Sequence, residues 1–316
     1  MKRFSLVPLI LVVFSQTCLA WGRRGHQIVG ETAATIVSTE PNADFMRDHS
    51  FDFAYYNNVP DFFWKEPKTY DIERPQHYMN LEIFDRAFKA KPEEKNPFEL
   101  NRQAFDAKFP EIPFTAGRAF WRIRERVAAL EAVTDQLKKM DIKQVQARRD
   151  LQGKWMVIAG TLGHYVADLS QPLHVSMNYD GEETGQKGVH SFFEDACVDE
   201  LYPELTVAVK KEVEKRWPKF KKENSNKPLI QLLDQEAKGS LAKHKMVLDI
   251  DKRTQRDLKK ASRAYQKLIV ERLAEGSLYL AEIFRRNLGF SFDNKKFYYF
   301  EGEPTWVNPL DDAKRL

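Results

Sequence analysis

The stretch that decides how this chain is organised is residues 163–174, Gly-His-Tyr-Val-Ala-Asp-Leu-Ser-Gln-Pro-Leu-His. His164 and Asp168 are four residues apart in an apolar run, so a helix would place both side chains on one face. Pro172 cannot continue such a helix, and we expect the helix to end just before it. His174 follows at once. Imidazole and carboxylate groups are ligands that Zn²⁺ takes, although a helix whose His and Asp only hydrogen-bond each other would read the same way.

Long helical patterns dominate the rest of the chain. Apolar residues recur at helical spacing over 120–140, 151–169 and 258–288, whereas 77–84 reads as a short strand or extended loop. A further helix is expected over 190–201, and no linker or internal repeat divides the chain. The sequence therefore predicts an all-α fold, a single multi-helix domain over 21–290 followed by an aromatic tail, 291–316, that packs on it.

The first twenty residues are typical of a signal peptide. Lys2 and Arg3 precede an apolar run over 4–14, and Cys18-Leu19-Ala20 has small residues at the positions that a signal peptidase reads. Cleavage after Ala20 would make Trp21 the N-terminus of an exported protein, periplasmic or secreted. A lipoprotein anchored through the cysteine is the less favoured alternative, because the preceding Ser-Gln-Thr lacks the usual leucine.

The cysteine count argues against an internal disulfide in the mature chain, and the net charge argues against nucleic-acid binding by bulk charge. Cleavage would leave Cys197 as the one cysteine, so the mature chain could form no internal disulfide, and this thiol is expected to pack as a small apolar group. The formal charge of the whole chain is +4, and two of its basic residues leave with the signal peptide. This near-neutral balance gives little support to nucleic-acid binding by bulk charge.

Five of the seven histidines lie in short motifs with the character of metal ligands. His190 and Glu194 repeat the spacing of His164 and Asp168. The other two histidines, His49 and His244, stand among polar neighbours and are interpreted as surface residues. The motifs, in chain order, are Trp21-Gly-x-x-Gly-His26, Asp61 in Asn58-Val-Pro-Asp, His77-Tyr78, His164-x₃-Asp168-x₅-His174 and His190-x₃-Glu194.

In this order the motifs resemble those of the S-one/P-one nucleases, exported single-strand-specific nucleases with three zinc ions, and of their relatives the zinc-dependent phospholipases C. The resemblance covers most of residues 21–290, and the set of motifs is highly specific. Both groups share a mostly α-helical fold. The resemblance implies three sites, whose ligands would be Asp61, His77, His164 and Asp168 for one zinc; His26, Asp168 and the α-amino nitrogen and carbonyl oxygen of Trp21 for a second; and His174, His190 and Glu194 for the third.

The resemblance also implies a mechanism. Two close zinc ions bridged by Asp168, one of them also held by Asp61, would yield hydroxide at neutral pH, which would attack phosphorus in line. The third zinc would offset charge on the phosphate and the leaving oxygen. Asn80 stands where the nucleases carry an aspartate that orients the attacking water, and an amide loses the charge-assisted hydrogen bond. Trp64 stands where they usually carry an arginine, so Trp64 and Lys65 are expected to contact the substrate, and Lys65 could supply that charge.

The residues favour a nuclease and leave alternatives open. The motif that starts at Trp21 and the aromatic Tyr78, which could stack on a base, favour an endonuclease that acts on single-stranded DNA or RNA, leaves 5′-phosphates and could act as a 3′-nucleotidase. Glu194 in place of aspartate favours a phospholipase C that acts on phospholipid head groups. Asn80 would also suit a zinc-binding protein with weakened catalysis. No obligate protein partner is indicated.

Overall fold

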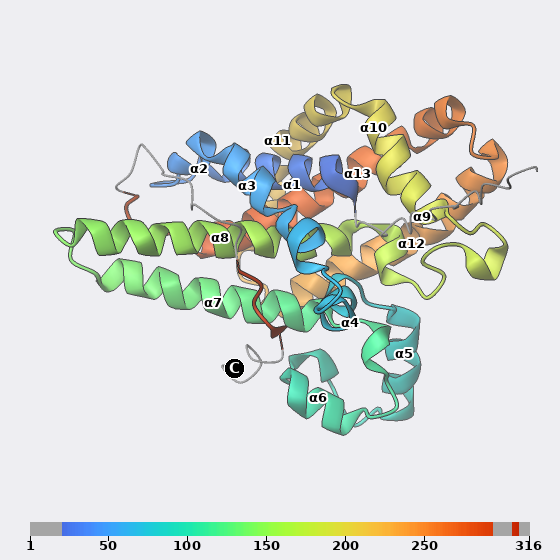
Figure 1. Cartoon of the computed structure of the whole chain (residues 1–316), viewed down its shortest axis with the longest axis horizontal. Coiled ribbons are helices and arrows are strands. Elements are labelled where there is room, and N and C mark those ends of the chain that lie inside the picture. Colours follow the sequence, from blue (N-terminus) through green and yellow to red (C-terminus); the bar gives the residue numbers. More distant parts are fainter. Residues whose placement is uncertain (1–20, 293–304, 310–316) are drawn as a thin grey trace, which may run out of the picture.

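The computed structural model describes residues 21–292 and 305–309 (Figure 1). The predicted signal peptide, 1–20, lies outside this part of the chain. Within it the chain forms no strand, and the one β-type pairing is an isolated bridge between Met79 and Gly117. The predicted all-α, single-domain fold is confirmed.

The helices are of unequal length, and five of those in the described part of the chain exceed twenty residues. The longer α-helices are α1 (Gly22–Val37), α5 (Leu81–Ala90), α7 (Ala119–Lys139), α8 (Val145–Ser170), α11 (Glu204–Asn224), α12 (Leu229–Thr254) and α13 (Leu258–Arg286). The short ones are α2 (Phe45–Asp48), α3 (Ser50–Tyr56), α4 (Tyr70–Glu73), α6 (Arg102–Lys108), α9 (Val189–Ser191) and α10 (Cys197–Leu201). Single turns of 3₁₀- or π-helix include η1 (Pro60–Trp64), η2 (Arg74–His77), η5 (Pro172–Val175) and η7 (Phe192–Ala196).

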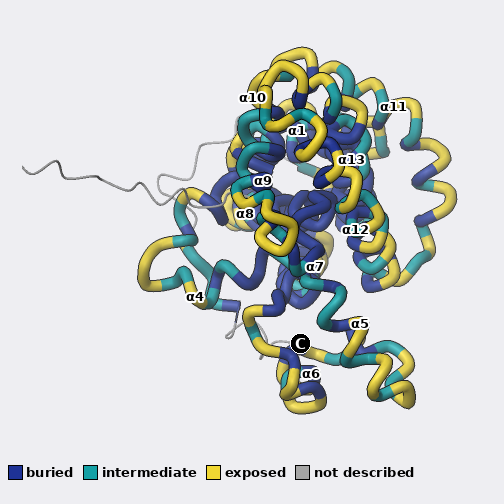
Figure 2. The backbone as a smooth tube through the Cα atoms, turned by 90° about the vertical axis from the view of Figure 1, so that its right-hand side faces the viewer, coloured by how far each residue is buried: buried dark blue, intermediate teal, exposed yellow. Residues whose placement is uncertain are grey.

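Helix α8 runs through the centre of the molecule, with α7 along one side of it (Figure 1). It also packs against α3, α12 and α13. At Gly163 the neighbouring elements come so near that an added Cβ would lie 2.8 Å from Leu280 Cδ2 and 2.9 Å from Asn57 Oδ1. Only glycine permits this approach, which brings Asn57 against the turn that carries His164. The tube in Figure 2 is buried where α1, α8 and α13 meet.

The long helices expected over 120–140, 151–169 and 258–288 are present as α7, α8 and α13. The expectation of a strand or extended loop over 77–84 is wrong beyond its first residues. His77 closes the 3₁₀ turn η2, Tyr78 is extended, and α5 begins at Leu81. Alternation of apolar residues over so few positions does not distinguish a strand from the first turn of an amphipathic helix.

The C-terminal segment, 291–316, is described at 291–292 and 305–309, and these residues contact the domain. The ring of Phe292 stacks on that of Phe45 with centroids 4.2 Å apart. Trp306 donates its indole N–H to Glu73 Oε2 at 2.7 Å. No helix in the described part of the chain is both long and apolar enough to cross a membrane.

Candidate metal centre

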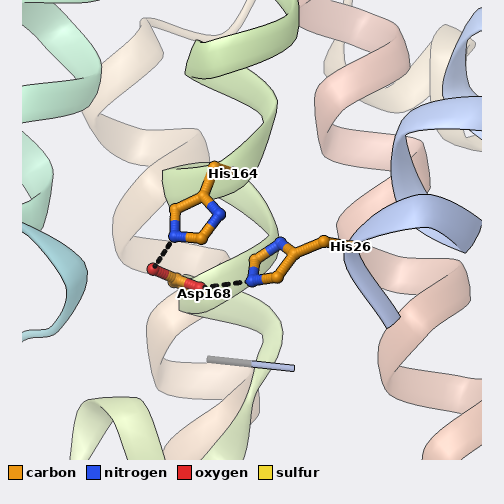
Figure 3. Close-up of side chains that lie close together, drawn as sticks. All are labelled: His26, His164 and Asp168. Atoms are coloured by element: carbon orange, nitrogen blue, oxygen red, sulfur yellow. Dashed lines mark ion pairs between the residues drawn. The ribbon is translucent and has the colours of Figure 1, made fainter. Parts of the chain in front are cut away.

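The first candidate group joins α1 to α8 through His26, His164 and Asp168 (Figure 3). His26 Nε2 lies 3.3 Å from Asp168 Oδ1, and His164 Nε2 lies 3.4 Å from Asp168 Oδ2. The two imidazole rings stack with centroids 3.9 Å apart. The side chains are buried, and the carboxylate of Asp168 lies between two rings from different helices.

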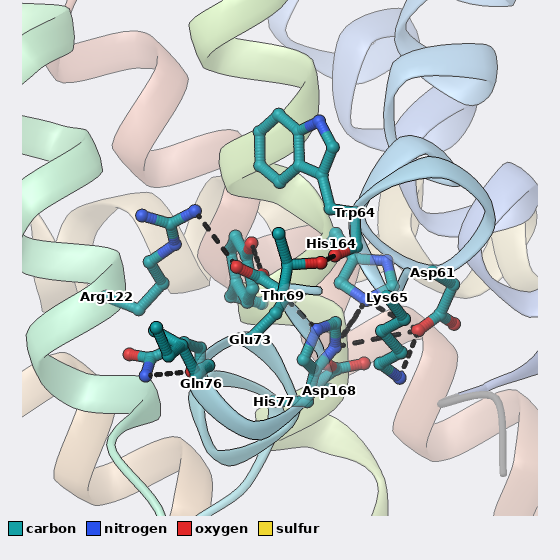
Figure 4. A network of polar contacts seen from close by, with 12 residues as sticks. Asp61, Trp64, Lys65, Thr69, Glu73, Gln76, His77, Arg122, His164 and Asp168 are labelled. Atoms are coloured by element: carbon teal, nitrogen blue, oxygen red, sulfur yellow. Dashed lines mark hydrogen bonds and ion pairs between the residues drawn. The ribbon is translucent and has the colours of Figure 1, made fainter. Parts of the chain in front are cut away.

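The second group shares His164 and adds Asp61 from η1 and His77 from η2 (Figure 4). His164 Nε2 lies 2.8 Å from His77 Nδ1 and 3.5 Å from Asp61 Oδ1. His77 Nδ1 also lies 3.1 Å from Asp168 Oδ2. Asp168 therefore faces both groups, as the ligand assignment expected from the family resemblance requires of a bridging carboxylate.

The third group lies beyond the end of α8 and consists of His174, His190 and Glu194. Glu194 Oε2 lies 2.8 Å from His190 Nε2 and 3.8 Å from His174 Nε2. The two Nε2 atoms are 3.1 Å apart. All three side chains are buried, and three potential donor atoms converge.

Hydrogen bonds fix which ring nitrogens are available in the third group. His174 Nδ1 donates to the carbonyl of His77 at 2.8 Å, and His190 Nδ1 donates to that of Tyr179 at 2.9 Å. A neutral imidazole that donates through Nδ1 carries a lone pair on Nε2. The two facing Nε2 atoms therefore repel unless one buried ring is protonated or a cation accepts both lone pairs. Donation of the distal N–H to a carbonyl is also the usual arrangement of metal-bound histidine.

Burial and the surrounding charges put His26, His174 and Asp168 in protonation states that suit metal binding, whereas Asp168 and then Asp61 outweigh burial and raise the pKa of His164. Burial lowers the pKa of His26, and it lowers the pKa of His174 to about 3, so both rings are neutral. Burial alone would raise the pKa of Asp168, but His164 and then His174 outweigh it and hold that pKa well below its usual range. Burial raises the pKa of Glu194 to about 7, so a bound cation would displace its proton near neutrality.

Unpartnered buried atoms give an independent indication that the groups could hold metal ions. Within the described part of the chain, both ring nitrogens of His26 lack a hydrogen-bond partner, as do Asp168 Oδ1 and Glu194 Oε1. Burying a polar atom without a partner costs about 1–3 kcal/mol. Four such atoms within groups of converging His and carboxylate ligands fit cations, and the three groups could each hold one.

Trp21 lies at the N-terminus of α1, where its backbone has the left-handed φ of 30°. Its indole N–H donates to Ser170 Oγ at 2.8 Å, and its carbonyl accepts from Gly25 at 3.1 Å. The carboxylate of Asp195 packs so closely that a Cβ on Gly22 would lie 1.9 Å from Oδ1. These contacts fix the backbone of Trp21 one turn before His26. Its expected amine ligand depends on a cleavage that falls outside the described residues.

A cavity of about 270 Å³ opens beside the second and third groups. It is lined by Lys65, Tyr78 and Asn80 from the predicted set and by His77, His174 and His190 from the groups themselves. Lys65 also forms an ion pair with Asp61. Trp64 corrects the expectation of a substrate contact: its side chain is 1% exposed and packs beneath the guanidinium groups of Arg122 and Arg126.

The sequence analysis missed residues that hold the candidate ligands in place. Asn57 accepts from His164 Nδ1 at 2.7 Å through its carbonyl and donates through Nδ2 to the carbonyl of His26 at 2.7 Å. Gln171 donates to Glu194 Oε2 at 2.8 Å. Asn57 precedes the motif Asn58-Val-Pro-Asp61, and Gln171 lies within the stretch 163–174. Nothing in their spacing distinguishes either residue from an ordinary turn residue.

Comparisons of the chain with protein-family models, with curated proteins and with solved structures found no match. The proposal below therefore rests on the motifs and on the geometry of the three groups.

The prediction that His49 is a surface residue is wrong: this side chain is buried, and its Nδ1 lies 2.8 Å from Asp52. His244 is half-buried and contacts the carbonyl of Asn178 at 3.1 Å. Neither belongs to a candidate metal group in the described residues.

Proposed function

We propose that this protein is a zinc-dependent phosphodiesterase that hydrolyses single-stranded DNA or RNA to 5′-phosphate products, with possible action on 3′-nucleotides. The observation that carries the proposal is the convergence of three buried groups, two of which share His164 and face the carboxylate of Asp168. Adjacent metal ions sharing a carboxylate are the usual arrangement for displacement at phosphorus. The proposal places the protein with the S-one/P-one nucleases that its motifs resemble.

The donor atoms favour zinc over other divalent cations. Each group combines imidazole nitrogen with carboxylate oxygen, and the described part of the chain contributes no thiolate to any of them. Hard cations such as Mg²⁺ and Ca²⁺ prefer oxygen ligands alone, whereas zinc takes this mixture. When bound, a zinc pair supplies an activated water near neutral pH and offsets charge on the phosphate.

The side chains that line the 270 Å³ cavity suit a nucleotide phosphate and base. Lys65 and Arg74 bring positive charge to the cavity, and Tyr78 and Tyr179 bring aromatic rings. Tyr78 is held by a hydrogen bond from its hydroxyl to the carbonyl of Thr115 at 3.1 Å, which fixes the plane of its ring. A base can stack on such a ring while its phosphate faces the metal groups.

Asn80 lines the same cavity, and its buried amide oxygen has no hydrogen-bond partner among the described residues. This oxygen can accept a hydrogen bond from a water or a substrate hydroxyl and so orient it. An amide cannot act as a base, so Asn80 would not take a proton from that water or hydroxyl. Because Asn80 lacks the negative charge of the aspartate expected at this position, a zinc-binding protein with weakened catalysis remains the second alternative.

The phospholipase C alternative rests on Glu194, which is buried with one oxygen toward His190 and the other unpartnered in the described chain. Both substrate classes present a phosphodiester to the same metal groups. They differ in what surrounds it, because a nucleotide offers a flat base and a lipid offers acyl chains. The aromatic rings in the cavity favour the base.

The test is a side-by-side assay of the purified mature protein on single-stranded DNA, RNA and phosphatidylcholine, with and without a zinc chelator. We expect cleavage of both nucleic acids that chelation abolishes and added zinc restores. His244→Ala is the matched control, because this histidine lies outside all three groups, and it should keep full activity. Turnover of the lipid alone would establish the phospholipase alternative. A zinc-loaded protein that cleaves none of the three would be the binding protein.

A further inference from the structure

A second and larger cleft, of about 650 Å³, is lined by residues of α1, α3 and η1. Phe62 and Phe63 of η1 line this cleft, whereas Lys65 just after η1 lines the cavity. Neighbouring residues of helix α1 also serve the two sites: Gln27 lines the cleft, and His26 belongs to the first metal group. The cleft is therefore a separate hollow whose walls are shared with the metal centre.

Aromatic side chains in this cleft are exposed to an extent that packing does not explain. Phe51 of α3 is 78% exposed, and Phe62 and Tyr55 are 47% and 45% exposed. Single exposed apolar residues are ordinary, but rings gathered in one concave surface mark a binding site. Helices α1 and α3 lie side by side (Figure 1), so the rings and the polar side chains of α1 face a common space.

One basic side chain in the cleft is available to an anionic ligand. Of the two acids that line the cleft, Glu31 forms an ion pair with Lys210 at 2.6 Å, and Asp52 lies 2.8 Å from His49 Nδ1, a ring that offsets its charge only when protonated. Arg23, which also lines the cleft, forms no ion pair with any residue in the described part of the chain. Arg23 therefore offers the cleft a guanidinium that no acid in the described residues pairs with, and a guanidinium binds phosphate well.

We propose that this cleft binds bases of a single-stranded polynucleotide outside the phosphodiester that is cleaved, with Arg23 on the backbone phosphate. Exposed rings stack on bases without regard to sequence, and the ion pair between Glu31 and Lys210 reduces the repulsion that would oppose the strand. A strand that crosses η1 occupies both hollows, so longer substrates are held better than short ones. The location of the cleaved bond rests on the proposed function, whereas strand binding in the cleft does not.

The experiment measures binding of fluorescein-labelled, phosphorothioate-linked dT12 to the full mature protein by fluorescence anisotropy. Stacking on two rings predicts that Phe51→Ala/Phe62→Ala weakens binding at least tenfold. Arg23→Ala should lower the slope of log affinity against log salt by about 0.7, the value for one phosphate contact with a single strand. Ile142→Ala, which removes an equally exposed apolar side chain in the turn between α7 and α8, should change neither quantity.

The outcomes separate this proposal from the proposed function. Equal binding of dT12 by the double variant and its parent would overturn it, provided that both have the same helical circular dichroism. Binding to phosphatidylcholine vesicles is measured in parallel. If the double variant loses vesicle binding but binds dT12 as its parent does, the proposal is also overturned, because the rings would then contact lipid. A parent protein that binds dT12 through these residues but cleaves no phosphodiester would support the cleft while refuting the nuclease.

Discussion

Glu73 offers the sharpest test of how the fold holds the candidate ligands. This carboxylate is fully buried at the end of α4 (Figure 4) and lies 3.4 Å from His77 Nε2. It accepts hydrogen bonds from the hydroxyl of Tyr165 and from the indole of Trp306, and Arg122 lies 3.5 Å away. Glu73→Gln removes the charge and keeps the shape, but it turns an amide N–H toward groups that are themselves donors.

The magnitude follows from the pKa of Glu73. Burial would raise this pKa, but Arg122 and then His77 outweigh it and lower the pKa from 4.5 to about 2. At about 1.4 kcal/mol for each tenfold change in acidity, the ionised form stabilises the fold by about 3 kcal/mol at neutral pH. Because the pKa is lower in the folded state, this contribution is complete above pH 4.5. It is lost as the pH falls through 4.5 toward 2.

The assay is urea unfolding followed by circular dichroism at pH 7, 5 and 3.5, with metal content held constant. We expect the parent to exceed Glu73→Gln by about 3 kcal/mol at pH 7 and nearly as much at pH 5, with about two-fifths of the difference lost by pH 3.5. Glu223→Gln, an exposed carboxylate paired with Lys219 at 3.7 Å, is the control and should change stability by less than about 0.5 kcal/mol. A difference below about 1 kcal/mol at pH 7, or one independent of pH, would refute the reasoning.

Three further predictions concern the N-terminus and the metal groups. Trp21→Phe keeps an aromatic ring, although a smaller one, but loses the N–H donated to Ser170 Oγ, so the midpoint of thermal unfolding should fall by at least about 2–4 °C, and an unchanged midpoint would contradict this. Gly22→Ala places a Cβ 1.9 Å from a carboxylate oxygen at a φ of 49°, and urea unfolding should show a loss of about 2 kcal/mol or more; a loss near zero would mean that the carboxylate moves freely. Asp168→Ala should release more metal per chain than Glu194→Ala in elemental analysis, because Asp168 faces two groups, and equal losses would argue against a bridging carboxylate.

Sequence pattern predicted the fold where one side of a helix is consistently apolar. Helices α7, α8 and α13 pack against the core over most of their length, and their apolar spacing shows it. Helix α12, Leu229–Thr254, was not predicted, although its apolar residues also recur at helical spacing. Its inner face includes the buried polar residues Glu236 and Ser240, whose burial a one-dimensional pattern does not reveal.

The candidate ligands were predictable because metal ions need particular side chains at particular spacings. The residues that orient these ligands were not, since any buried acid or amide can do so and its partner is distant in sequence. Glu73 lies 92 residues from Tyr165 and 233 from Trp306 along the chain. The prediction for Trp64 is wrong in the opposite sense: the sequence predicts a substrate contact, but the large apolar ring is buried in the core.

The break at the end of α8 explains how one stretch of sequence serves separate groups. Had the helix continued, His174 would follow Asp168 by six residues, a rotation of about 240° that points the ring to another side of the helix. Instead α8 ends at Ser170, Gln171 is extended with ψ of 120°, as a residue before proline requires, and η5 turns the chain. His174 then meets His190, while Asp168 stays with the first two groups. The proline is thus as necessary to the arrangement as the ligands, and its replacement by alanine would extend α8 at the expense of the third group.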